Sequence, residues 1–169
     1  SKPVWETLRK ITNKRSDKLV KIYWDGKKYI KFKFEDYELT GKLVDKKYFD
    51  ILRVIPDDHK TKITLSADEL IKSITLMEKL KEDKQRVDIK IDNVVTLETR
   101  TTDNVLIDTI PATVIGQPLE IRFDIKLFSK VIKQYKGEEL IIEFNGSVGP
   151  GILKSDNKLE IIMPVRRDG

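Results

Sequence analysis

The segment Leu119–Phe144, LEIRFDIKLFSKVIKQYKGEELIIEF, decides the fold, because it contains a strand, a helix and a second strand in direct succession. Alternating LEIRF and ELIIEF are typical of strands, whereas the apolar residues between them recur at helical spacing. Asp124 is a suitable N-cap, and Gly137 is a natural helix stop. The apolar stripe of this helix comprises Ile125, Phe128, Val131, Ile132 and Tyr135.

Two other segments have the same helical periodicity. PVWETLRKITNKR (3–15) and SADELIKSITLMEKLK (66–81) each place apolar side chains on one face. Ser66 and Glu69 have the spacing of a capping box at the start of the second segment. The two stripes comprise Trp5, Leu8 and Ile11, and Leu70, Ile74, Met77 and Leu80.

Strand-like segments follow each helix in groups of three. The order of one helix and three strands recurs three times, at a period of roughly 55 residues, and KITL and PLEIRF precede the second and third helices. We therefore expect an α+β fold of three repeated helix-plus-strands units, with the helices on one face of the sheets. The predicted strands are 18–24, 29–34, 39–44, 62–65, 86–91, 94–100, 105–114, 118–123, 138–144, 152–155 and 159–165.

The segment IPDDHKTK (55–62) interrupts this pattern with proline and charges. It predicts a first domain over residues 1–56, a linker over 57–62 and a second domain over 63–169.

The composition is that of a globular chain with a highly charged surface. Hydrophobic residues make up 39% and charged residues 36% of the sequence, and no apolar run approaches a membrane span. There is no cysteine, and SKPVWETLRK lacks the apolar core of a secretion signal. These features predict a cytoplasmic protein without a membrane partner.

Lysines dominate the face of each predicted helix that lies opposite its apolar stripe. With a net charge of +5, the chain favours a polyanionic partner, although a solvated lysine surface is the simpler alternative. Because no aromatic residue accompanies these lysines, they predict nonspecific, salt-sensitive binding of a phosphate backbone. The candidate DNA-binding residues are Lys10, Lys14, Lys72, Lys126, Lys130 and Lys133.

Motifs for catalysis are missing from the sequence. It has no phosphate-binding glycine loop, and its single histidine, His59, excludes most nucleophile–histidine systems. His59 could join Asp57 and Asp58 as metal ligands, but three adjacent loop residues rarely converge on one ion. We expect no enzyme activity, no cofactor and no metal.

Four motifs, in the same order along the chain, resemble the bacterial DNA polymerase III beta sliding clamp family. They are YELTGKLVDKKYFDILRVIP (37–56), VDIKIDNVVTLETR (87–100), the opening segment (119–144) and IIMPVR (161–166). The resemblance covers about residues 3–166, and it corresponds to the second half of the middle clamp domain plus the C-terminal domain. It implies a ring whose helices line a hole for double-stranded DNA, with residues 1–56 as a half domain.

The resemblance also implies a groove that binds short peptides of polymerases and other clamp partners. In the family, a C-terminal Met-Pro-x-Arg strand lines this groove. The simpler alternative is that this segment is only the last strand of the core. Both roles are compatible, since alternate side chains of a strand face opposite sides. The residues carried over are Arg53, Val54, Val148, Pro150, Ile161, Met163, Pro164, Val165 and Arg166.

Three functional alternatives remain open at the level of the sequence. Family rings contain twelve half-units, so three per chain would require self-association of four chains. A truncated clamp mimic could instead regulate or inhibit a full-length clamp or its partners, and Lys79, at a ring-closing position that is usually apolar, favours this reading. The third alternative is a fragment of a longer clamp.

Overall fold

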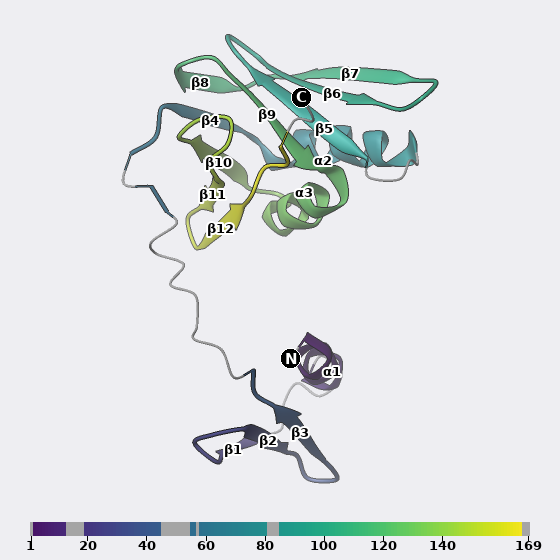
Figure 1. Ribbon diagram of the computed structural model, residues 1–169, viewed down its shortest axis with the longest axis vertical. Helices are drawn as coiled ribbons and strands as arrows, with labels where there is room; N and C mark the ends of the chain where they lie inside the picture. The colour runs from purple at the N-terminus through teal and green to yellow at the C-terminus, as the bar shows by residue number, and fades with distance from the viewer. Residues whose placement is uncertain (1, 13–18, 45–54, 57, 81–84, 167–169) are drawn as a thin grey trace. The chain divides into compact units, whose positions relative to one another are not determined.

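The chain folds into two compact units, Ser1–Phe49 (unit 1) and Asp50–Gly169 (unit 2). The computed structural model in Figure 1 describes residues 2–12, 19–44, 55–56, 58–80 and 85–166. The division falls before the predicted boundary at residue 56. Thr61 and Lys62, which the sequence assigned to the linker, lie instead in strand β4, where they pair with β8 and β10.

Unit 1 contains one helix and a three-stranded antiparallel sheet of order β1-β2-β3. The buried residues Leu8, Phe32 and Phe34 form its small core. Helix α1 packs on β3, where Gly41 gives it room: a Cβ at this position would lie 2.9 Å from Val4 Cγ1. The elements are α1 (Lys2–Thr12), β1 (Lys21–Trp24), β2 (Tyr29–Lys33) and β3 (Glu38–Lys42).

Unit 2 contains two antiparallel sheets and two helices. The five-stranded sheet has the order β12-β11-β10-β4-β8, and the four-stranded sheet has the order β7-β6-β5-β9. The strands are β4 (Thr61–Ser66), β5 (Arg86–Ile91), β6 (Val95–Arg100), β7 (Val105–Ile110), β8 (Thr113–Gly116), β9 (Leu119–Asp124), β10 (Glu139–Phe144), β11 (Gly151–Ser155) and β12 (Lys158–Ile162). The helices are α2 (Ala67–Met77) and α3 (Ile125–Ile132), which continue into the 3-10 turns η2 (Glu78–Leu80) and η3 (Lys133–Tyr135).

The order strand–helix–three strands occurs twice in unit 2, with β8 as an additional strand at the end of the first half, and the two halves exchange their leading strands. Strand β4 pairs with β10 of the second half, and β9 pairs with β5 of the first half. Helices α2 and α3 contact each other; α2 also contacts β4 and β7, and α3 contacts β9 and β12. Each helix therefore touches both sheets, which confirms an α+β fold with helices packed on antiparallel sheets.

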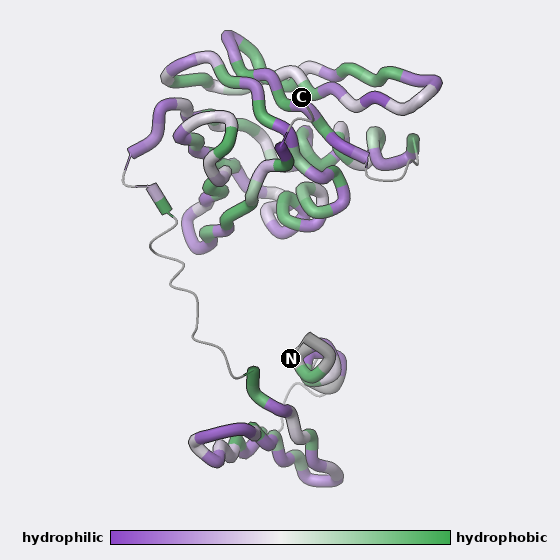
Figure 2. Tube along the Cα trace, in the orientation of Figure 1, coloured by the Kyte–Doolittle hydropathy of each residue, from purple (hydrophilic) through white to green (hydrophobic). Residues whose placement is uncertain are grey.

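The predicted apolar stripes form the core of unit 2. Leu70, Ile74 and Met77 of α2 are buried, as are Ile125, Phe128 and Ile132 of α3. The rings of Phe123 and Phe128 stack at 5.1 Å between centroids. Figure 2 shows the matching alternation of hydrophobic and hydrophilic residues along the strands, so one side of each sheet faces this core.

The ends of α3 and the N-cap position of α2 follow the sequence prediction, whereas the predicted capping interaction of α2 does not form. The Asp124 carboxylate accepts a hydrogen bond of 3.0 Å from the Leu127 amide, and Gly137 takes a positive φ of 80° after η3. Ser66 occupies the N-cap position of α2, but its hydroxyl makes no capping hydrogen bond. The predicted capping box is therefore wrong.

We expect Asp124→Ala to lower the free energy of unfolding by about 1 kcal/mol, because one amide of the first turn of α3 loses its acceptor. The Asp124 carboxylate also accepts a hydrogen bond of 3.0 Å from Arg86 Nη1. The comparison variant is therefore Asp124→Asn, which keeps a capping oxygen but removes the charge that faces Arg86. Urea unfolding measures both variants. Equal stability of wild type and Asp124→Ala would contradict the capping role.

Two predicted strands end earlier in the structure than in the sequence prediction. The segment 105–114 is split into β7 and β8 at Pro111, since proline donates no hydrogen bond to a ladder and the chain passes there from one sheet to the other. Strand β12 ends at Ile162, one residue before Met163 and two before Pro164. Residues 163–166 therefore lie beyond the strand, and we call them the C-terminal tail.

Candidate functional site

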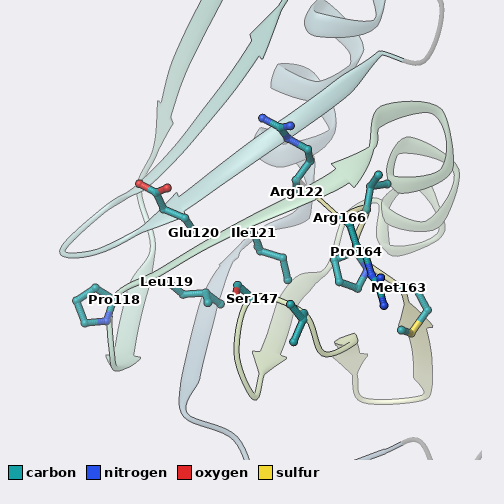
Figure 3. Close-up of a pocket in the computed structure, with 11 residues that line it drawn as sticks. Pro118, Leu119, Glu120, Ile121, Arg122, Ser147, Met163, Pro164 and Arg166 are labelled. Carbon is teal, nitrogen blue, oxygen red and sulfur yellow. The ribbon is translucent and has the colours of Figure 1, made fainter. Parts of the chain in front are cut away.

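A pocket of about 990 Å³ opens where β9, the loop between β10 and β11, and the C-terminal tail meet. We call it the C-terminal groove (Figure 3). Its lining residues are Pro118, Leu119, Glu120, Ile121, Arg122, Ser147, Val148, Met163, Pro164, Val165 and Arg166.

The tail forms one wall of the groove because a backbone hydrogen bond holds it beside β9. The amide of Val165 donates to the Arg122 carbonyl at 2.8 Å, and Ile162, the last residue of β12, is buried. Between these two anchors, Met163 is 55% exposed. An unbranched thioether in this position suits an apolar ligand, since methionine adapts its shape to its partner.

Strand β9 forms the second wall. In Figure 3 the side chains of Leu119 and Ile121 leave β9 on one side, and those of Glu120 and Arg122 leave it on the other. The alternation of LEIRF contains this signal, but sequence reasoning used it for the core only and missed β9 as a wall of the groove.

Charged side chains border the apolar part of the groove. Arg122 donates two hydrogen bonds to Asp88, from Nε at 2.9 Å and from Nη2 at 2.8 Å. This bidentate geometry fixes the guanidinium group on the outer face of the sheet. Arg166 is exposed at the end of the described tail, and Glu120 also lines the groove, so charged residues of both signs accompany the apolar ones.

Five of the nine predicted groove residues meet in this pocket: Val148, Met163, Pro164, Val165 and Arg166. Pro150 and Ile161 do not line it; Ile161 pairs with Ile152 inside the five-stranded sheet, and Pro150 is half-buried just before β11. Arg53 and Val54 lie outside the described residues.

The predicted DNA-binding lysines have different surroundings. Lys72 of α2 and Lys126 and Lys130 of α3 are exposed. The Lys133 ammonium lies 3.2 Å from a Glu78 carboxylate oxygen, which links the end of α3 to that of α2 and offsets its charge. Lys10 is exposed on α1 of unit 1, and Lys14 lies outside the described residues.

The polar cluster around His59 does not form a metal site in the described part of the chain. His59 Nδ1 lies 3.8 Å from Glu143 Oε1, and Asp58 accepts a hydrogen bond of 3.1 Å from the Asn145 amide. Asp57 is outside the described residues. Among the residues that are described, no three His, Asp or Glu side chains are arranged to hold a metal ion.

No described helix has the length and apolarity needed to cross a membrane.

Comparison with known proteins identifies relatives over most of the chain. The chain is 25% identical to the beta sliding clamp of Bacillus subtilis over 80% of its length, and 21% identical to that of Synechococcus elongatus over 98%. Its fold is similar to that of a Bartonella birtlesii sliding clamp crystallised with griselimycin, with a TM-score of 0.87 and 24% identity over 98% of the chain.

The chain spans less than half the length of these relatives: 38% of the Bacillus protein and 46% of the Synechococcus and Bartonella proteins. The family described as DNA polymerase III beta subunit, C-terminal domain, matches residues 52–166. This family is not enzymatic, in agreement with the missing catalytic motifs. The chain therefore belongs to the sliding clamp family of DNA replication proteins, through its C-terminal clamp domain.

Proposed function

We propose that this chain acts as a clamp-type protein in DNA replication and binds short peptides of its replication partners in the C-terminal groove. The observation that carries the proposal is the convergence of β9, Val148 and the tail residues 163–166 on one pocket, which apolar residues and Arg166 line together. Apolar anchors in such a pocket supply most of the binding energy of a peptide.

Binding of duplex DNA is the second part of the proposal. The exposed lysines Lys72, Lys126 and Lys130 lie on two helices that contact each other, so their charges share one region of unit 2. Ammonium groups on flexible side chains suit nonspecific contacts to phosphates. We also propose that all three helix-plus-strands segments are copies of one module, and that the protein is located in the cytoplasm.

Met163→Asp is expected to weaken peptide binding by at least about tenfold, since a carboxylate in an apolar groove is desolvated without a partner. The measurement is isothermal titration calorimetry with a clamp-motif peptide that has an aliphatic and an aromatic anchor residue, and with griselimycin.

Leu159→Asp is the matched control, because Leu159 is similarly exposed on β12 but does not line the groove. We expect this variant to bind as the wild type does. If neither ligand binds the wild-type chain, or if both variants bind equally, the groove is not the peptide site.

A regulatory role is the second candidate, favoured by Lys79, which is exposed on η2 at a position where the ring-closing helix of the family is usually apolar. In this role the chain would act as a partial clamp that captures clamp partners or docks on a full-length clamp. Native mass spectrometry of the chain mixed with a full-length clamp measures this directly. A mixed complex supports regulation, whereas a homotypic complex of four chains supports a ring.

A further inference from the structure

Among the described strands, β1 of unit 1 pairs along one of its two edges only. In unit 2 the first strand after each helix has a neighbour on both sides: β5 lies between β6 and β9, and β10 lies between β11 and β4. Strand β1 follows α1 in the same way, but it has β2 as its only neighbour among the described strands. Among the described residues, its second edge carries no strand and could accept one.

Apolar side chains remain uncovered on this part of the sheet. Ile22 pairs with the buried Phe32, and Trp24 pairs with Ile30, so both lie on the face that α1 covers at β2 and β3. They are nevertheless 62% and 68% exposed. An isoleucine and a tryptophan at an open strand edge are typical of an interaction surface rather than of a free edge.

The hydrogen-bond pattern defines which main-chain groups are directed to the open edge. The Asp25 amide donates to the Tyr29 carbonyl, so Asp25 and Tyr23 direct their main-chain groups toward β2. Because this direction alternates along a strand, the amides and carbonyls of Ile22 and Trp24 point away from β2.

We propose that unit 1 pairs with unit 1 of a second copy of this chain, with the two β1 strands antiparallel and Ile22 of each copy opposite Trp24 of the other. This register keeps both apolar faces on the same side and uses only main-chain groups at the open edges. The result is a six-stranded sheet in which both α1 helices cover one face. This surface is separate from the C-terminal groove, and neither inference depends on the other.

Charge complementarity favours a second copy as the occupant. In this register Lys21 of one copy lies opposite Asp25 of the other, and the two-fold axis makes this pair occur twice. The Asp25 carboxylate accepts the amides of Tyr29, Lys27 and Lys28 at 2.8–3.0 Å. These bonds, that of Tyr29 foremost, lower the pKa of Asp25 because they stabilise its charged form.

Cross-linking tests the pairing and its register together. The chain contains no cysteine, so Tyr23→Cys introduces a single thiol at the residue that faces its own copy across the two-fold axis. Opposed Cα atoms in such a pair lie about 4.5 Å apart, within the range of a disulfide. We expect mild oxidation to convert most of this variant into a covalent dimer. Thr40→Cys on β3, the control, should stay mostly monomeric.

Sedimentation equilibrium measures the association itself. We expect a dimer of the wild-type chain at micromolar concentration, and a dissociation constant at least about tenfold higher for Trp24→Lys and for Lys21→Glu. Tyr29→Lys, an exposed aromatic residue on the inner strand β2, is the control that leaves association unchanged.

Two results would overturn the proposal: a wild-type monomer, and a dimer that does not cross-link at position 23.

Discussion

Replacement of Lys72, Lys126 and Lys130 together by Glu is expected to reduce the affinity for duplex DNA by at least about 100-fold at ~0.1 M salt. Each ammonium group that contacts a phosphate releases a condensed counterion, so the logarithm of the binding constant falls linearly with the logarithm of salt concentration. Loss of three such contacts should make this slope shallower by about 2.7. Fluorescence anisotropy with a labelled duplex at several salt concentrations measures both quantities.

The control for this prediction has the same change in net charge. Lys28, Lys60 and Lys90 are exposed outside the helices, and their joint replacement by Glu leaves α2 and α3 unchanged. If the two triple variants lose the same affinity, net charge alone explains binding and the helices are not the DNA-binding surface. Lys133 is left out because it is paired with Glu78.

Phe128→Ala is expected to lower the free energy of unfolding of unit 2 by about 3–5 kcal/mol. Phe128 is fully buried, and its ring stacks on Phe123. Helix α3 contacts β9 and β12, which belong to different sheets, so the cavity would loosen the packing between both sheets and the helix.

Denaturant unfolding followed by circular dichroism measures this change. Leu127→Ala is the control, because the neighbouring side chain is about half exposed and its removal should cost less than about 0.5 kcal/mol. A loss below 1 kcal/mol for Phe128→Ala would mean that α3 does not join the two sheets as described.

The sequence was sufficient to predict the helices, because their stripes carry strong local periodicity. Leu70, Ile74, Phe128 and Ile132 are all buried as expected. The exchange of β4 and β9 between the two halves of unit 2 was not predictable, since strand partners far apart in the chain leave no local pattern. The split at Pro111 was hidden for the same reason, because the segment 105–114 reads as one strand and its two parts join different sheets.

The candidate site could also be predicted only in part, because the sequence reveals local motifs but not contacts between distant residues. Met163, Pro164 and Val165 were identified through a motif that is contiguous in sequence, and they do line the groove. The wall from β9 depends on the hydrogen bond between Val165 and Arg122, which joins residues 43 positions apart (165 − 122 = 43). The pairing of Lys133 with Glu78 is equally nonlocal, so a lysine expected to contact DNA is already partly neutralised.

Nuclear magnetic resonance of the labelled chain, titrated with a clamp-motif peptide, tests the central claim most directly. If the C-terminal groove binds the peptide, the amide signals that shift will belong to Leu119, Ser147, Val148 and Met163. Shifts confined to other parts of the chain, or none at a millimolar peptide concentration, would contradict the assignment of this groove as the partner-binding site.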